Sequence, residues 1–172
     1  MTVTVRPATR DDLAAVYELT CGFDAREPGD PDEEFRARYE RILGRDDWAL
    51  LVADAGGTLA GYALVQDFGP GLRRGFSTGR MHDLYVAEPH RRRGAGRALM
   101  AAVTAWARAR QYPLILDWSA RLDSVPFYDS LGLRGDPVGD NARYPAYCLD
   151  FRAERGPHSD PERPLPLEGA PP

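Results

Sequence analysis

The chain has 172 residues, enough for one α/β domain with a hydrophobic core and too few for two ordinary domains. It carries 22 basic (Lys+Arg) and 26 acidic residues, and its net charge of −4 argues against nucleic-acid binding through general excess positive charge. Hydrophobic residues make up 43% of the chain, too many for a wholly disordered protein, and no apolar run approaches the roughly 20 residues that cross a bilayer. We therefore expect a soluble protein whose partners are neither nucleic acids nor membranes.

The N-terminus and the cysteines bear on location and on metal binding. The first residues, MTVTVRPATRDDL, lack the basic start, apolar stretch and cleavage site of a secretory signal, so we expect a cytoplasmic protein. Cys21 and Cys148 have no Cys or His at metal-ligand spacing, and two cysteines cannot form a disulfide framework. We expect both to be buried free thiols, and we expect no metal site.

Apolar spacing, helix-capping residues and turn residues predict the elements of the first half of the chain. In chain order these are a strand at residues 3–7, a helix that Thr9 begins, an acid-rich loop at 24–34, a helix at 35–43, a hairpin of strands at 48–53 and 59–65, a Gly-rich loop at 68–79, and a strand at 81–86.

The second half continues as an alternation of helices and strands. It comprises a helix from about 94 to 110, a buried strand at 114–118, a helix at about 124–131 that Gly132 ends, and two last strands, one near Leu133 and one within 144–151. Residues 152–172 are rich in Pro, Gly and charge, and we expect them to form a disordered C-terminal tail. Residues 1–151 then make up the one folded domain.

The segment from Leu84 to Leu99 carries the most information about chemistry. A strand ends here, and an Arg-x-x-Gly-x-Gly loop, Arg91 to Gly96, opens an amphipathic helix. Glycines allow close approach to a ligand, and the unpaired amides of a first helical turn favour a phosphate. Alternatively, the glycines only form a tight start of the helix and the arginines only face water. A nucleoside-triphosphate loop is excluded because the chain has no lysine, and Leu99 stands where a dinucleotide fold needs its third glycine.

This segment resembles a family motif. Leu84-x-Val86-x-x-Pro89 followed by Arg91-x-x-Gly94-x-Gly96 is similar to the acetyl-CoA motif of the GNAT superfamily of N-acetyltransferases. Phe127-Tyr128-x-x-Leu131-Gly132-Leu133 resembles the second motif of that superfamily. The resemblance implies an α/β (α+β) GNAT-like fold with a central mixed, mostly antiparallel, splayed sheet of about six to seven strands and about four helices.

The resemblance also implies roles for single residues. The acetyl-CoA pyrophosphate would be bound around the loop residues Arg91, Arg92, Arg93, Gly94, Ala95, Gly96 and Arg97, and the pantetheine arm would pair with Leu84, Tyr85 and Val86, with Ser124 and Phe127 beside it. Tyr128 would protonate the leaving thiolate. The chain departs from the family at three positions. It has Arg92 where many relatives have Gly, Arg121 where they often have Asn, and Ser124 where they often have Ala.

The general base is the open part of the implied site. An alkylammonium with a pKa near 10.4 must lose a proton before it attacks a thioester. Relatives often use a glutamate just before the position of Leu84, where this chain has His82 and Asp83. In a regular strand these two side chains point to opposite faces, so we expect only one to face the amine, while the alternatives of a water chain and of a hydrogen-bonded core His82 stay open.

The implied activity is an acetyl-CoA-dependent N-acetyltransferase. It would move an acetyl group to a primary amine of a small molecule or peptide by direct attack, without a metal. The acid-rich loop at 24–34 would either lie over the acceptor pocket or be solvated. The alternative function is a non-catalytic module that binds or senses acyl-CoA, and the sequence leaves open whether the protein forms a homodimer.

Overall fold

The computed structural model of the protein describes residues 3–73, 75–135 and 144–152. Its elements are, in chain order, β1 (Thr4–Pro7), α1 (Leu13–Phe23), α2 (Glu33–Leu43), β2 (Trp48–Asp54), β3 (Leu59–Pro70), β4 (Ser77–Val86), α3 (Ala95–Arg108), β5 (Leu114–Ser119), α4 (Val125–Asp129) and β6 (Ala146–Asp150). The strands form one mixed sheet in the order β1-β2-β3-β4-β5-β6. This confirms the expected α/β fold class.

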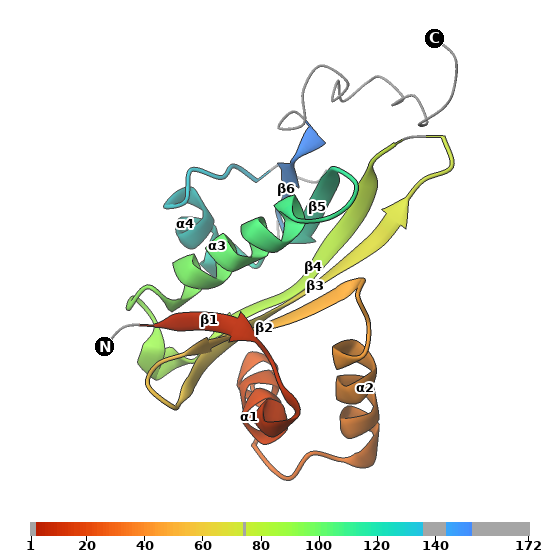
Figure 1. Ribbon diagram of the computed structural model, residues 1–172. Coiled ribbons are helices and arrows are strands. Elements are labelled where there is room, and N and C mark those ends of the chain that lie inside the picture. Colours follow the sequence, from red (N-terminus) through yellow and green to blue (C-terminus); the bar gives the residue numbers. More distant parts are fainter. Residues whose placement is uncertain (1–2, 74, 136–143, 153–172) are drawn as a thin grey trace. The chain divides into compact units, whose positions relative to one another are not determined.

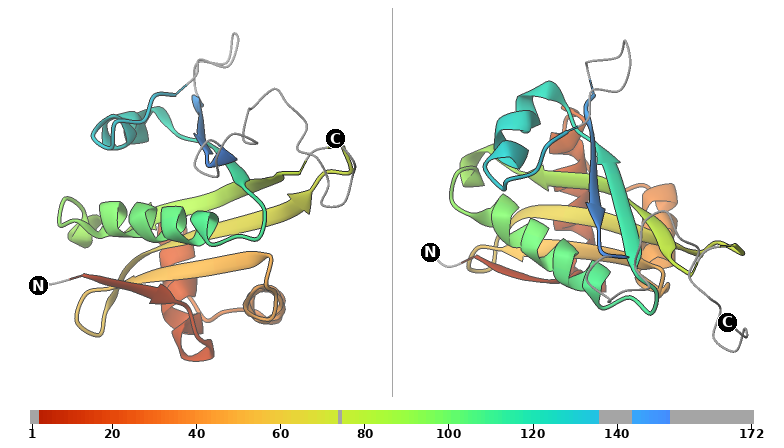
Figure 2. Two further views of the ribbon diagram at one scale, coloured as in Figure 1. Left: turned by 45° about the horizontal axis from the view of Figure 1, so that its top comes forward. Right: turned by 90° about the horizontal axis from the view of Figure 1, so that it is seen from above.

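The chain forms two compact units, each assembled from two stretches of sequence. Unit 1 takes Met1–Gln66 and His82–Trp106, and unit 2 takes Asp67–Met81 and Ala107–Pro172. Within unit 1, α1 and α2 cover one face of the β1-β2-β3 strands and α3 covers the opposite face (Figures 1 and 2). This layering requires strands β2 and β3 to be apolar on both faces.

The core of unit 1 follows from the alternation of side chains along its central hairpin. In the β2–β3 register Leu50 lies opposite Leu64, and Val52 lies opposite Tyr62. These residues lie at alternate strand positions and therefore share one face, where Leu50, Val52 and Tyr62 join a buried cluster with Val16 of α1. Burial of these side chains is what holds α1 and α2 to the sheet.

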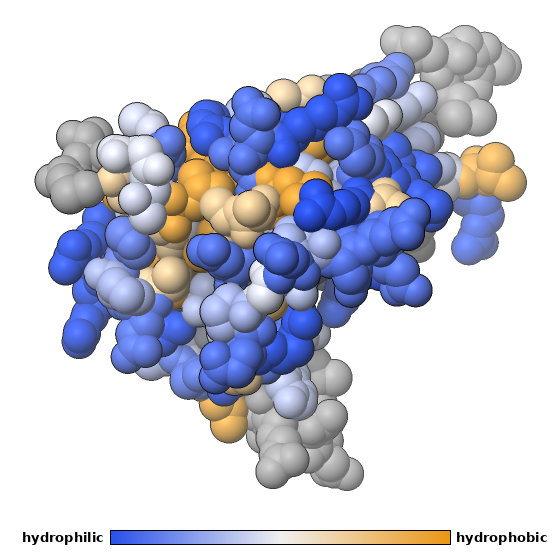
Figure 3. Space-filling view, turned by 90° about the horizontal axis from the view of Figure 1, so that it is seen from below, coloured by the Kyte–Doolittle hydropathy of each residue, from blue (hydrophilic) through white to orange (hydrophobic). Residues whose placement is uncertain are grey.

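The helix α2 shows how local sequence sets an element in unit 1. Asp32 accepts a hydrogen bond from the Phe35 amide at 2.6 Å, so the helix is capped at its N-terminus and begins two residues earlier than predicted. Tyr39 is its buried residue, and most of the others are exposed. The molecular face seen from the α1 and α2 side is accordingly dominated by hydrophilic residues (Figure 3). The acid-rich loop before α2 is exposed over nearly its whole length.

Unit 2 corrects the expected Gly-rich loop at 68–79. Strand β3 continues to Pro70, and β4 already begins at Ser77. Residues Ser77 to Arg80 pair in parallel with Leu114 to Asp117, and Ser77 is fully buried. Pairing with a buried, apolar strand overrides the weak strand propensity of this glycine-containing segment.

A strand near Leu133 was also a wrong prediction, since residues 131–135 contain none. The Leu133 amide instead donates to the Tyr128 carbonyl at 3.1 Å, and the Leu131 amide donates to the same oxygen at 3.0 Å. Gly132 has φ +78°, as expected for a residue that ends a helix. The amide that a strand would need is therefore used to cap α4. Residues 136–143 lie outside the described residues.

The prediction that both cysteines are buried is confirmed for one of them only. Cys21 is buried as predicted, but Cys148 is exposed because it occupies an outward-facing position of β6.

Arg152, the first residue of the expected tail, is buried, ion-paired with Asp150 at 2.6 Å, and stacked over the Phe76 ring at 4.7 Å. Residues 153–172 lie outside the described residues.

Candidate active site

The C-terminal half of β4 differs from its N-terminal half. From Ser77 to His82 buried and exposed residues alternate strictly, whereas the four residues from Asp83 to Val86 are all half-buried. The ladder between β4 and β5 ends at the Arg80–Asp117 pair, so Leu84 to Val86 lie beyond it. The segment predicted to hold a pantetheine arm is thus the part of β4 that does not pair with β5.

His82 is exposed and is held by two side chains of the β2–β3 hairpin. Its ring stacks on the Trp48 indole with 4.9 Å between centroids and 15° between planes. Its Nε2 lies 3.3 Å from Gln66 Oε1, and this oxygen accepts a hydrogen bond from the ring only in the tautomer with the proton on Nε2. Trp48 and Gln66 are opposite each other in the hairpin register, so one cross-strand pair holds the imidazole. The alternative of a core histidine is therefore wrong.

Asp83 is half-buried and contacts a different side chain of the same hairpin. The Tyr62 hydroxyl donates to Asp83 Oδ2 at 3.3 Å. Burial raises the pKa of Asp83, and the Tyr62 hydrogen bond and the nearby His82 act in the opposite direction. Burial also raises the pKa of Tyr62, so the phenol stays protonated as a donor.

His82 and Asp83 were expected to point to opposite faces of the sheet, but both contact side chains on the same face of β3. Tyr62 and Gln66 are four residues apart on β3 and share a face, yet each contacts one of the two neighbours. The physical reason is that the strict alternation of β4 stops between them. Both side chains are consequently available on one side of the hairpin.

Tyr85 packs its ring against the elements that support this end of β4. Its ring centroid lies 5.8 Å from that of Phe23 and 6.4 Å from that of Tyr62. A Cβ added to Gly61 would overlap the Tyr85 carbonyl oxygen, so only glycine allows β3 to approach β4 here. The backbone of Tyr85 is thereby fixed against β3.

The loop that follows β4 presents a run of unused backbone donors. Among the described residues, the amides of positions 92 to 96 donate no hydrogen bond, and the Ala98 amide donates to the Gly94 carbonyl at 2.9 Å. Arg92 and Gly94 both have positive φ, +59° and +91°. A Cβ at Gly94 would meet nothing within 4 Å, so the glycine is needed for its backbone conformation rather than to avoid a clash.

The arginines of the loop do not share one role. Arg91 Nε donates to the Val86 carbonyl at 3.0 Å, and its guanidinium lies 5.9 Å from the centre of the Tyr85 ring. Arg91 therefore ties the loop to the end of β4. Arg92, Arg93 and Arg97 are exposed, Gly96 is half-buried and Ala95 is buried.

The second predicted motif lies in unit 2. Tyr128 is 4% exposed, and burial raises its pKa to about 12. Its ring contacts those of Phe127, Trp118 and Tyr147 at centroid distances of 5.1, 5.5 and 4.6 Å. Phe127 and Ser124 are half-buried, and the Ser124 hydroxyl lies 3.4 Å from an oxygen of the neighbouring Asp123.

Sequence reasoning missed the side chains that support the predicted ones. Trp48, Gln66 and Tyr62 contact His82 and Asp83, and Tyr147 contacts Tyr128. The pairing of Trp48 with Gln66 follows from the predicted hairpin once its register is known. The contact of Tyr62 with Asp83 depends on how β4 meets β3, for which the sequence carries no local signal.

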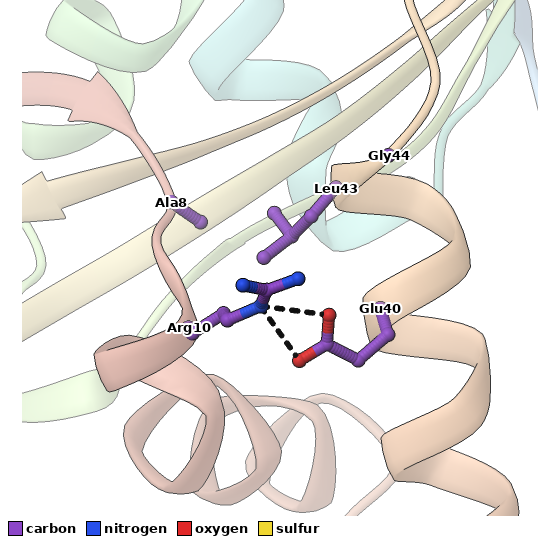
Figure 4. A pocket seen from close by; sticks show the side chains of 5 residues that line it. All are labelled: Ala8, Arg10, Glu40, Leu43 and Gly44. Atoms are coloured by element: carbon purple, nitrogen blue, oxygen red, sulfur yellow. Dashed lines mark hydrogen bonds and ion pairs between the residues drawn. The ribbon is translucent and has the colours of Figure 1, made fainter.

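A hollow elsewhere in unit 1 contains none of the predicted residues. It is lined by Ala8, Arg10, Glu40, Leu43 and Gly44, and Arg10 Nε donates to both Glu40 oxygens at 3.0 and 3.2 Å (Figure 4). The charges that line it are thus already paired with each other. Within the described ranges, no group of three His, Cys, Asp or Glu side chains is arranged to hold a metal ion, and no helix has the length and apolar character needed to cross a membrane.

Solved structures with this fold come from several sources. A transcriptional regulator from Bacillus halodurans C-125 is 22% identical, with a TM-score of 0.70 over 80% of this chain and 97% of its own. A Trypanosoma brucei acetyltransferase is 25% identical, with a TM-score of 0.64 over 78% and 94%. AAC(6′)-Iy in complex with the bisubstrate analogue CoA-S-monomethyl-acetylneamine is 24% identical, with a TM-score of 0.61 over 77% and 90%.

Family membership rests on the sequence match. No curated protein matches the chain significantly. The model of the acetyltransferase (GNAT) family matches residues 10–133, which include β4, the loop with unused amides, α3 and the segment around Tyr128. More than half of the chain is covered, so the protein belongs to the GNAT acetyltransferase family.

Proposed function

We propose that the protein is an acetyl-CoA-dependent N-acetyltransferase that acetylates a primary amine of a small molecule or a peptide. The observation that carries the proposal is the run of amides from residue 92 to 96 that donate no hydrogen bond within the described chain. The first amides of a helix have no acceptor within the helix, and a run of five such donors that no protein group uses suits a diphosphate. Membership of the GNAT family and the fold shared with an enzyme bound to a CoA analogue support the same substrate.

The loop and the end of β4 would bind the two parts of this substrate separately. The amides of residues 92 to 96 would donate to the diphosphate, with the exposed Arg93 adding positive charge. Leu84 to Val86 would offer backbone groups to the amides of the pantetheine arm. The thioester itself supplies an activated acetyl group. The residues present fit this substrate, since a glycine with open space stands at position 94.

The side chains around β4 would prepare the amine. His82, held by Trp48 and Gln66, or Asp83, held by Tyr62, would take the proton from the ammonium form. The amine nitrogen then forms the bond to the carbonyl carbon, the carbon–sulfur bond breaks, and Tyr128 would give its proton to the thiolate. The proton that the nitrogen loses on becoming an amide would pass through water to the Tyr128 phenolate and restore the phenol. We propose direct transfer without a metal or an acyl-enzyme, and a cytoplasmic location.

Thiol release in the presence of acetyl-CoA and a panel of amines tests the proposal. We expect amine-dependent release by the wild-type chain and a loss of about 100-fold or more in kcat for Tyr128→Phe, the usual range for removing a general acid. Tyr112→Phe, at a partly exposed tyrosine outside the site, is the matched control and should keep the wild-type rate. Equal rates for all three proteins would remove Tyr128 from the mechanism.

Binding without turnover is the outcome that favours the alternative module. If calorimetry shows acetyl-CoA binding while no amine in the panel releases thiol, the protein binds or senses acyl-CoA. If acetyl-CoA does not bind, the assignment of the loop itself is wrong.

A further inference from the structure

Trp118 is packed directly against the proposed acid. It lies on β5 and is 3% exposed. It pairs with Tyr147 across the β5–β6 ladder, and the two rings stack with 5.6 Å between centroids and 8° between planes. Tyr128 contacts both rings, at 5.5 Å from Trp118 and 4.6 Å from Tyr147. The three rings form one cluster within unit 2, and this cluster fixes where the Tyr128 phenol can lie.

The indole nitrogen of Trp118 has no structural partner to explain its burial. Among the described residues, Nε1 of Trp118 and Oγ of Ser77 are the buried side-chain polar atoms with no hydrogen bond. A buried N–H without an acceptor costs free energy, so its retention needs a reason. Phenylalanine would fill most of the same space without that cost.

The Tyr128 ring lies 5.5 Å from the indole and carries a hydroxyl that an indole donor would affect. Burial raises the pKa of Tyr128, and the Trp118 side chain acts in the opposite direction. A donor in this position stabilises the phenolate more than the phenol, because the phenolate oxygen carries the charge.

We propose that Trp118 is a positioning residue for Tyr128, whose indole N–H closes to hydrogen-bonding distance on the phenol oxygen when Tyr128 gives up its proton. This rests on the proposed function, in which Tyr128 is the acid that protonates the leaving thiolate. The unpaired N–H in the resting protein is then a donor held ready for a charge that exists only during the reaction. Trp118 would act on the thioester only through Tyr128.

The test measures the phenol itself and does not depend on turnover. 3,5-Difluorotyrosine is placed at position 128, which brings the phenol pKa into a range where the protein is folded, and its absorbance is titrated. The variants are Trp118→Phe and, to keep the ring shape while removing the N–H, replacement of Trp118 by 3-benzothienylalanine. Trp106→Phe, at an indole outside the cluster, is the matched control. Circular dichroism checks that each variant is folded.

The expected result is a pKa at position 128 that is higher by about 0.5 to 1 in both Trp118 variants, the effect of one hydrogen bond, and unchanged in Trp106→Phe. In the unlabelled enzyme Trp118→Phe should lower kcat about 3- to 10-fold at constant KM, and should have no further effect in a Tyr128→Phe background. An unchanged pKa in the benzothienylalanine variant would overturn the role of Trp118. Wild-type turnover by Tyr128→Phe would instead overturn the proposed acid, whichever way the titration comes out.

Discussion

Gly94 offers the sharpest test of the phosphate loop, because the chain contains a matched control. Gly94 has φ +91° and Gly57, in the turn between β2 and β3, has φ +92°. A Cβ at either position would meet nothing within 4 Å. Alanine therefore meets a matching positive φ and no clash at both sites, and only Gly94 lies in the loop with unused amides.

The cost to stability should be the same for the two variants. A left-handed backbone conformation costs an alanine roughly 1–2 kcal/mol. The smaller conformational freedom of alanine in the unfolded chain returns about 0.4–1 kcal/mol. Gly94→Ala and Gly57→Ala should each lower the free energy of unfolding by about 1 kcal/mol, which urea denaturation measures as an earlier midpoint with an unchanged slope.

The cost to binding should differ between them. If the loop at Gly94 relaxes away from its left-handed conformation, at least one amide loses its direction toward the diphosphate. A hydrogen bond to a charged group contributes about 1.5–3 kcal/mol, so the Kd for CoA should rise about 10- to 100-fold in Gly94→Ala. Isothermal titration with CoA should give a wild-type Kd for Gly57→Ala. Equal Kd values for the two variants would refute the assignment of the loop.

Two further changes test how the fold holds the site. Gly61→Ala puts a Cβ against the Tyr85 carbonyl, so it should lower the free energy of unfolding by at least about 2 kcal/mol, more than Gly57→Ala does in the same urea series. The Arg6 guanidinium holds the pKa of Asp12 at about 2. Because the folded pKa is depressed, the resulting stability of about 2 kcal/mol is complete above pH 4 and is lost as the pH falls from about 4 to 2. Asp12→Asn should flatten that dependence, and an unchanged pH profile between pH 6 and 3 would contradict the assignment of the ion pair.

The sequence predicted best the elements whose signals are local. The hairpin of β2 and β3 was predicted because both strands are apolar and a turn separates them, and α2 was predicted because its apolar residues recur at helical spacing. The strand at Ser77 to Gly79 was missed because its stability comes from pairing with Leu114 to Leu116, more than 30 positions away. The expected strand at Leu133 failed for a related reason, because its amide caps α4.

The candidate site divides in the same way. The loop from Arg91 to Gly96 was predicted as a phosphate site from its spacing, because the groups that it would offer are consecutive backbone amides. The partners of Asp83 and His82 were not identified, because Tyr62 and Trp48 reach them only through the pairing of separate strands. The alternation of buried and exposed residues along β4 also stops at Asp83. The rule that neighbouring residues of a regular strand point to opposite faces therefore fails for His82 and Asp83.

Arg92 indicates that the shape of the loop is imposed from its ends. An arginine at φ +59° is in a conformation that costs of order 1 kcal/mol and persists only where the surroundings determine it. On one side Arg91 is bonded to the Val86 carbonyl, and on the other the Ala98 amide is bonded to the Gly94 carbonyl. These bonds hold the backbone of the loop at both ends, so the amides would need little reorganisation to bind the proposed diphosphate. Since the backbone sets this geometry, we expect diphosphate binding to depend on Gly94 more than on the charge of the exposed side chains of the loop.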